Sequence, residues 1–312
     1  MRVLRADVLG FCMGVRRAVD LACAEAERAA GAIGTQGQAA GAISQQSPAG
    51  APGRVFTFGP LIHNPHALEE LKTRGLEIME KLPADLHGIT LVIRAHGIDP
   101  SKEQEIKRCG GRIVDATCPR VKASQLKARD LEDSGYRLFL AGEEGHAEVL
   151  GIKGYSPGCI VVGNSEEAQS AAGNLHKREP DTKTALIGQT TISPEEYRAV
   201  GEEIQKYFSG LKVIDTICPA TTDRQNSLRS LLKQVDAVIV AGGKESANTR
   251  RLLTIAQQHG KPCVQAESAA DIPPEFFRFD TVGLCAGAST PDSVIDEIEK
   301  SLTQKAHAKT QR

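Results

Sequence analysis

Short apolar runs alternate with segments of helical spacing along most of the chain. Runs at 89–93 and 136–141 are typical of buried strands, whereas 15–30, 121–134 and 194–208 repeat apolar residues at helical intervals. A polar loop follows each strand. This alternation predicts an α/β fold with mostly parallel sheets and right-handed crossovers. In such sheets ligands bind at the carboxyl ends of the strands, where these loops lie.

One block of sequence occurs twice. Asp115-Ala116-Thr117-Cys118-Pro119 and Asp215-Thr216-Ile217-Cys218-Pro219 lie 100 residues apart, and each leads from an apolar run into a helical segment. The residues that follow keep the same distances from their cysteine: 28 to His146 and Ser246, 30 to Glu148 and Asn248, and 72 and 71 to Thr190 and Ser289.

A third copy lies at the N-terminus. Cys12 and His63 are 51 residues apart, but residues 31–53 consist mainly of Gly, Ala, Gln, Ser and Pro without any charge. We expect this segment to be a flexible surface insertion. Without its 23 residues, the spacing from Cys12 to His63 is again 28. The chain is therefore predicted to be a threefold repeat with a period of about 100 residues.

The repeat also predicts domain boundaries. The third copy has no closing strand of its own at the C-terminus, and residues 1–11 contain a strand that could complete it. The three copies would then close into a ring. The predicted domains are 1–117, which contains the insertion 31–53, then 118–217 and 218–302, followed by a polar tail at 303–312.

Composition, charge and cysteine spacing argue against several classes of protein. The formal net charge is −1, so charge gives no indication of a nucleic-acid or membrane partner. No apolar run approaches the roughly 20 residues that span a bilayer, and the N-terminus lacks the pattern of a signal peptide. We therefore expect a cytoplasmic protein. Eight cysteines without a CxxC pair argue against a disulfide framework in that compartment.

The matched cysteines suggest a shared site. If the three copies face a common axis, the thiolates of Cys12, Cys118 and Cys218 meet there. Three soft ligands far apart in sequence suit a tetrahedral metal or an iron–sulfur cluster. A cubane with three protein ligands leaves its fourth iron open to substrate, as catalytic zinc sites keep an open position. Zinc remains chemically possible.

The strand-end loops carry many neutral donors and almost no Lys or Arg. Hydroxyl, amide and imidazole groups beside backbone N–H groups predict a small anion site that fits a phosphate or diphosphate better than a polynucleotide. The candidate residues are His63, Asn64, His96, His146, Glu148, Thr190, Thr191, Ser246, Asn248 and Ser289.

Glu148 is the only carboxylate at the matched loop positions, because its counterpart in the third copy is Asn248. A single carboxylate in a closed cavity acquires a raised pKa and can act as a general acid. We therefore assign proton delivery to Glu148, with His146 or Thr190 as the neighbouring relay.

Nine ordered motifs extend this interpretation from the first strand to the last helix. They are Gly10-Phe11-Cys12-Met13-Gly14-Val15, His63-Asn64-Pro65, Arg94-Ala95-His96-Gly97, Asp115-Ala116-Thr117-Cys118-Pro119, Gly145-His146-Ala147-Glu148-Val149, Gln189-Thr190-Thr191, Cys218-Pro219-Ala220-Thr221-Thr222-Asp223-Arg224-Gln225, Ser246-Ala247-Asn248 and Ala286-Gly287-Ala288-Ser289. Together they resemble the 4-hydroxy-3-methylbut-2-enyl diphosphate reductases. Only the insertion and the tail lie outside the resemblance.

The resemblance implies three α/β domains around a central cavity that holds one 4Fe–4S cluster. The cluster would have three cysteine ligands, Cys12, Cys118 and Cys218, and an open fourth iron that binds the substrate's hydroxyl group. Two electrons and protons would remove this hydroxyl as water and give isopentenyl and dimethylallyl diphosphate. This is the last step of the methylerythritol phosphate route to isoprenoids. The electron donor would be of the ferredoxin or flavodoxin type.

The resemblance also implies roles for the loop residues. The allylic diphosphate would be held by His63, His96, Ser246, Asn248 and Ser289, with help from His146. Glu148 would deliver protons together with Thr190 and His146, and the last two would also contact the substrate. One departure is Ala247, where the family usually has a second serine, so this chain lacks one hydroxyl group that would contact the diphosphate.

Two other functions stay open on the residues alone. A three-cysteine iron–sulfur hydro-lyase would remove water without net electron transfer. An iron–sulfur sensor or carrier would bind a cluster but no allylic diphosphate. The donor-rich loops around one carboxylate disfavour the carrier, because a carrier needs no such cavity.

Overall fold

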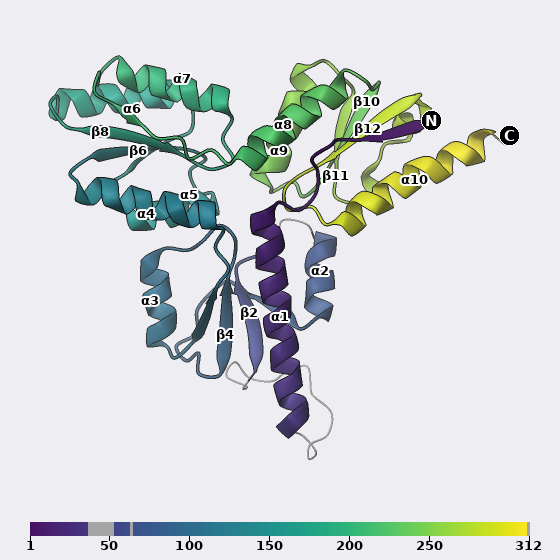
Figure 1. The fold of residues 1–312 in the computed structure, drawn as a ribbon, viewed down its shortest axis with the longest axis horizontal. Coiled ribbons are helices and arrows are strands. Elements are labelled where there is room, and N and C mark those ends of the chain that lie inside the picture. The colour runs from purple at the N-terminus through teal and green to yellow at the C-terminus, as the bar shows by residue number, and fades with distance from the viewer. Residues whose placement is uncertain (37–52, 63–64, 311–312) are drawn as a thin grey trace. The chain divides into compact units, whose positions relative to one another are not determined.

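The strands form three four-stranded sheets, and every strand pair is parallel. The computed structural model describes residues 1–36, 53–62 and 65–310 (Figure 1). The predicted α/β fold with mostly parallel sheets is therefore confirmed.

All three sheets have the same strand order. In spatial order they are β3 (Leu76–Met79), β2 (Arg54–Phe58), β4 (Ile89–Ile93) and β5 (Arg112–Asp115); β7 (Ile160–Val162), β6 (Arg137–Ala141), β8 (Thr184–Gly188) and β9 (Lys212–Val213); and β11 (Cys263–Ala266), β10 (Ala237–Ala241), β12 (Thr281–Ala286) and β1 (Arg2–Arg5). The repeat found in the spacings is thus a repeat of topology.

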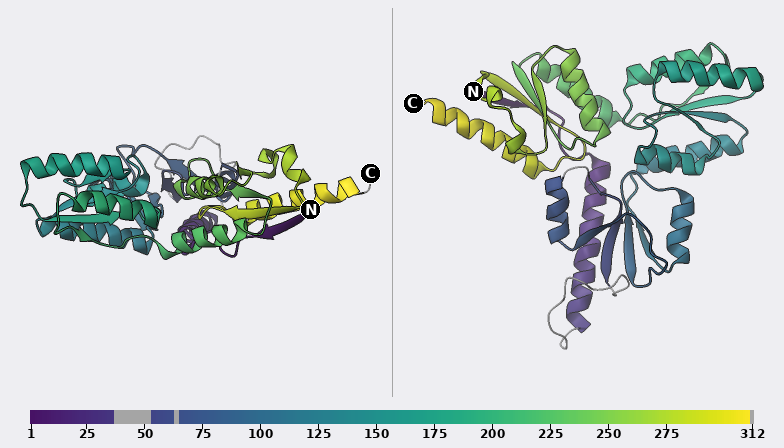
Figure 2. Two further views of the ribbon diagram at one scale, coloured as in Figure 1. Left: turned by 90° about the horizontal axis from the view of Figure 1, so that it is seen from above. Right: turned by 180° about the vertical axis from the view of Figure 1, so that it is seen from behind.

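The N-terminal strand β1 is the edge of the third sheet. It pairs with β12 in parallel, with Arg2 opposite Thr281 and Arg5 opposite Leu284 (Figure 1, Figure 2). In the other two sheets β5 and β9 hold this place. The first residues of the chain therefore supply the strand that the third copy lacks.

The helices connect successive strands. They are α1 (Met13–Gln36), α2 (Pro65–Thr73), α3 (Pro100–Arg108), α4 (Pro119–Asp133), α5 (Ala147–Tyr155), α6 (Ser165–Arg178), α7 (Pro194–Gln205), α8 (Pro219–Leu232), α9 (Ala247–Gln258) and α10 (Asp292–Thr310), with short 3-10 helices at Ala269–Asp271 and Pro274–Arg278. Several start where the sequence supplies a proline at the first turn, which fixes φ without losing a needed N–H group.

The chain divides into two compact units. One comprises Met1–Val19, Pro60–Arg74 and Pro219–Arg312 and contains the third sheet, while the other comprises Asp20–Gly59 and Gly75–Cys218 and contains the first two sheets.

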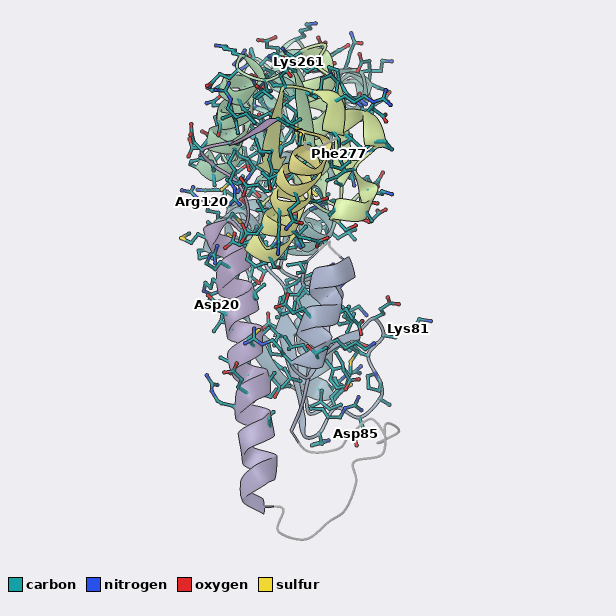
Figure 3. The ribbon with its side chains drawn as sticks, turned by 90° about the vertical axis from the view of Figure 1, so that its right-hand side faces the viewer. Asp20, Lys81, Asp85, Arg120, Lys261 and Phe277 are labelled. Carbon is teal, nitrogen blue, oxygen red and sulfur yellow. The ribbon has the colours of Figure 1, made fainter. Side chains whose placement is uncertain are left out.

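The central strands are apolar on both faces because helices cover both. In the second sheet Phe139 packs with residues of α6 and α7, whereas the next residue, Leu140, packs with residues of α4 and α5. The third sheet repeats this arrangement, with Val240 facing α8 and α9 and Ile239 facing α10. Phe277, on the second 3-10 helix, packs against the same cluster as α10 (Figure 3). Because these cores are apolar, the side chains that could take part in a reaction lie in the polar loops at the strand ends.

Helices α1 and α10 extend beyond their predicted bounds, and an edge strand was not predicted. Helix α1 continues to Gln36, six residues into the segment predicted as a loop, because Ala29, Ala30 and Ala32 favour a helix strongly enough to carry two glycines. The rest of the predicted insertion, residues 37–52, lies outside the described residues. Helix α10 continues through most of the predicted tail to Thr310. The edge strand β3 was not predicted, since its four residues follow a helix after only two positions.

Candidate active site

The three cysteines are anchored in the same way. The backbone N–H of Cys12 donates to the Ala288 carbonyl (3.0 Å), that of Cys118 to Ala95 (2.9 Å) and that of Cys218 to Thr190 (2.9 Å). Each cysteine directly precedes a helix, and each is partly exposed and outside any disulfide. Their equivalence, inferred from spacing, is thus present in the backbone hydrogen bonds. Cys118 and Cys218 belong to one unit and Cys12 to the other.

The same bonds correct one residue pairing of the repeat. Gln189 donates its N–H to Ala141, and Gly287 donates to Ala241, so Gln189 and Gly287 are equivalent. One position further on, Thr190 corresponds to Ala288, and Ser289 corresponds to Thr191. In this register the equivalent residues Thr190 and Ala288 lie 72 and 70 residues after Cys118 and Cys218, so the third copy is two residues shorter over this stretch. The Thr190 hydroxyl is therefore a feature of the second copy without a counterpart in the third.

Glu148 is a buried acid held by Thr190. Its carboxylate accepts the Thr190 backbone N–H (2.7 Å) and the Thr190 hydroxyl (2.9 Å), and its side chain is only 1% exposed. Burial raises the pKa of Glu148 to about 7, although both hydrogen bonds from Thr190 act to lower it. A carboxyl group of this pKa exchanges protons near neutral pH, which suits a general acid.

His146 and His96 lie beside this acid. His146 caps α5, and its Nδ1 accepts the Glu148 backbone N–H (3.2 Å). An accepting Nδ1 places the proton of the neutral ring on Nε2. The ring of His96 meets that of His146 edge-on, with 5.3 Å between their centroids. The structure thus brings Glu148, Thr190, His146 and His96 together in one unit.

The third copy presents a different set at the corresponding loops. Ser246 caps α9, and its hydroxyl accepts the Thr249 N–H (3.3 Å). Asn248 is 7% exposed, and its Nδ2 is buried without a hydrogen-bond partner among the described residues. Ser289 is also buried, directly after the carbonyl that anchors Cys12. These groups donate hydrogen bonds and carry no negative charge, so they suit an anion.

The loop containing Gly287 leaves no room for a side chain. A Cβ at Gly287 would lie 2.1 Å from the Thr249 hydroxyl oxygen, and one at Gly242, whose φ is +139°, would lie 2.8 Å from the same atom. Glycine at both positions therefore allows the strand-end loops to close around the start of α9.

Sequence reasoning missed the role of Arg224. This side chain is only 2% exposed, and its guanidinium donates to the Gly10 carbonyl (3.0 Å) and to the Ala286 carbonyl (3.2 Å). It thereby ties the loop that carries Cys12 to the end of β12. The sequence did contain a signal, because Arg224 lies near the start of α8 and within the motif Cys218–Gln225.

Other site predictions are less complete. His63 and Asn64 lie outside the described residues. The position of His63 in the repeat can still be found from the sequence. Gly59, Gly142 and Gly242 are equivalent, because each donates its backbone N–H to the neighbouring edge strand. Four residues after these glycines come His63, His146 and Ser246, which therefore occupy equivalent positions.

Among the residues that the structure describes, no three His, Cys, Asp or Glu side chains gather as a metal-binding group. Within the same ranges, no helix is long and apolar enough to cross a membrane.

Residues 38–303 match the family described as LytB protein. The 4-hydroxy-3-methylbut-2-enyl diphosphate reductase of Treponema denticola is 42% identical over 309 residues, covering 97% of this chain and 100% of the relative. The reductase of the same name from Aquifex aeolicus is 36% identical and covers 97% and 96%.

Solved structures agree with these relatives. That of (E)-4-hydroxy-3-methyl-but-2-enyl diphosphate reductase, the terminal enzyme of the non-mevalonate pathway, is 35% identical, with a TM-score of 0.64 over 97% of this chain and 100% of that chain. The corresponding Plasmodium falciparum reductase has a TM-score of 0.81 at 24% identity, covering 97% and 88% of the two chains, and supports the fold.

Proposed function

Because the chain belongs to the LytB family, we propose that it is a 4-hydroxy-3-methylbut-2-enyl diphosphate reductase. It would break the C–O bond of the substrate's allylic alcohol, using two electrons and two protons. The hydroxyl leaves as water, and the carbon skeleton becomes isopentenyl or dimethylallyl diphosphate. This would be the last step of the methylerythritol phosphate route.

The observation that carries the proposal is the Glu148–Thr190 pair. A hydroxyl group leaves poorly unless it is protonated, so the reaction needs an acid in a site from which bulk water is excluded. Glu148 is buried, has a pKa raised by burial to about 7, and is held through both oxygens by Thr190. Glu148 would donate the proton, and Thr190 and His146 would relay its replacement.

The cysteines fit an iron–sulfur cofactor by the chemistry of their donor atoms. Thiolates are the usual ligands of such clusters. Cys12, Cys118 and Cys218 each donate their backbone N–H to an equivalent carbonyl of a strand-end loop, and each is partly exposed. We assign them as the three ligands of one 4Fe–4S cluster with an open fourth iron. When bound, the cluster would supply electrons and polarise the C–O bond. The proposal requires all three thiols to reach the same cluster.

The diphosphate would bind the donors of the third copy together with the histidines. Asn248 offers a buried amide group without a hydrogen-bond partner among the described residues, and Ser246 and Ser289 offer hydroxyls. His96 and His146 would add imidazole donors from the second unit's loops, and His63 belongs to the same equivalent position as His146. With Ala247 in place of a second serine, the start of α9 would contribute backbone N–H groups instead.

The electrons must come from outside the chain. The family resemblance favours a small donor of the ferredoxin or flavodoxin type, which would deliver them one at a time.

Anaerobic purification with iron and sulfide counting, followed by titration with the allylic diphosphate, tests the proposal. We expect four irons and four sulfides per chain on the cluster stoichiometry. Turnover should require a reductant and should consume two electrons per product. Turnover without any electron source would favour the hydro-lyase instead, and a cluster without substrate binding would favour the carrier.

A further inference from the structure

A cavity of about 670 Å³ lies in the second compact unit, between α3 and α5. These two helices contact each other, and their cavity-lining residues include Lys102 and Leu150. None of the residues assigned above to the cluster or to proton delivery lines it within the described ranges. Its volume lies within the range typical of small-molecule sites.

Arg94 lines this cavity without an internal counter-ion. Its Nε is buried and has no hydrogen-bond partner, and no acid among the described residues pairs with it. The guanidinium lies against Gly59, where a Cβ would be 2.9 Å from Nη1. Burying an unpaired charge is costly, and burial lowers the pKa of Arg94. An anion in the cavity would remove that cost.

The remaining charges of the wall also favour an anion. Lys153 lines the cavity, and no ion pair joins it to an acid in the part of the chain that the structure describes. Lys102 pairs with Glu105 at 2.8 Å. The only acid of the wall, Asp99, already accepts the Ser101 N–H (2.7 Å) as the cap of α3. Asp99 keeps its negative charge while it caps α3, so Arg94, Lys153 and Asp99 together leave one net positive charge on the wall.

The rest of the wall is apolar. Phe58, Ile98, Leu150 and Pro157 line the cavity, and Leu150 is 52% exposed, which is unusual for a large aliphatic side chain on a helix. A wholly ionic ligand would leave this surface in water. A ligand with an anionic head and a short apolar chain would cover both parts.

We propose that this cavity binds a phosphate or diphosphate ester with a short apolar chain, at a site separate from the reaction site. Arg94 and Lys153 have no acidic partner among the described residues, and a guanidinium beside an ammonium favours the several oxygens of a phosphate head over a single carboxylate. The inference goes beyond the proposed function and does not depend on it. Since Gly97 of the wall directly follows His96, and Ala147 directly follows His146, occupancy would also affect the two histidines.

Calorimetric titration of the anaerobically purified full chain with geranyl diphosphate tests the proposal. We expect two binding events in the wild type. Lys153→Glu and Arg94→Gln should each weaken one event at least about tenfold, as expected for loss of a charge-assisted contact. Lys127→Gln is the matched control, because Lys127 is an exposed lysine of the same unit away from the cavity. Lys153→Glu should leave basal turnover unchanged, and it keeps the test valid if Arg94→Gln does not fold.

Asn248→Asp separates this inference from the proposed function. It should weaken the other event and spare the one that depends on Lys153. A single wild-type event that responds to Asn248→Asp but not to Lys153→Glu would overturn the cavity site. If only the Lys153-dependent event occurs, the cavity site stands, and the proposed substrate site is tested by the titration with its own allylic diphosphate. Octanoate displacing geranyl diphosphate from the cavity at equal concentration would overturn the assignment of a phosphate head.

Discussion

The second and third copies place different side chains on one backbone arrangement. His146 and Ser246 both cap the helix that follows the strand, and two positions later stand Glu148 and Asn248. Glu148 has both oxygens bound by Thr190, whereas the amide Nδ2 of Asn248 is buried without a partner among the described residues.

The difference follows from two side chains. In the second copy an acid and a hydroxyl satisfy each other, so the group can hold or release a proton without a ligand. In the third copy Ala288 replaces Thr190, and an amide replaces the acid. A buried donor without a partner gains most when a ligand oxygen arrives. One copy thus presents a buried acid and the other a buried amide donor, which is the basis of the proton-transfer and anion-binding roles that we propose for them, while the cysteines stay equivalent.

The largest effect should come from replacing the cysteines, which the copies have in common. Cys118→Ser and Cys218→Ser should each lose the brown absorbance of the cluster, because both thiols occupy the same position in their copies. Cys109→Ser is the control, since Cys109 is also partly exposed but ends α3 instead of preceding a helix. The measurement is iron content and visible absorbance after anaerobic reconstitution. A full cluster in either variant would contradict the ligand assignment.

The second largest effect should come from replacing the acid, Glu148. Glu148→Gln should lower turnover by about 10² to 10⁴, the range typical of general acids, with cluster and substrate affinity retained. Wild-type turnover should fall above about pH 7, because Glu148 must be protonated and its pKa is raised to about 7. The variant should lack this decline. Steady-state rates from pH 5 to 9 measure both, and unchanged activity would exclude Glu148 as the acid.

The buried acid should also appear in the stability of the chain. A carboxyl whose pKa is raised from 4.5 to about 7 stabilises the fold when protonated, and this contribution is lost as the pH rises through 7. The full loss is about 3 kcal/mol. The free energy of unfolding of Glu148→Gln relative to wild type should rise by that amount between pH 4 and 8. Chemical denaturation at several pH values measures it, and parallel pH curves would contradict the raised pKa.

The smallest expected effect concerns the anion-binding copy. Asn248→Asp places a carboxylate where the second copy has one, but without the threonine that holds Glu148. Repulsion of the diphosphate should raise KM about tenfold or more, with a smaller change in kcat. Asn248→Ala, which removes the donor without adding charge, is the comparison. An equal effect of both variants would show that charge at this position does not matter.

The spacing of the repeat predicted much of the fold. Equal distances after Cys118 and Cys218 indicated equivalent strands and loops, and the structure has the same strand order in all three sheets. The roles of the loop residues remain predictions, although Glu148 and Thr190 do meet. Their meeting was predictable because strand-end loops of one parallel sheet lie at one edge.

Other features had no signal of this kind. Arg224 joins Gly10 to Ala286 across more than 200 residues, and no spacing within one copy indicates that contact. Arg94 was part of a motif, but only the cavity shows that it lacks an acid. The extension of α1 to Gln36 depends on a balance of alanine and glycine preferences that composition alone does not decide.

The pairing of β1 with β12 has a consequence for how the protein is made. The first strand leaves the ribosome early but can pair only after Ala286 has been synthesised, so the third sheet closes last and through a contact of very long sequence separation. Before that point, β1 has no strand to pair with in the third sheet, and the Cys12 backbone N–H has no Ala288 carbonyl to bind. Cluster insertion would therefore wait for the end of translation, and a permuted chain that begins at α1 and carries β1 after α10 would remove the delay.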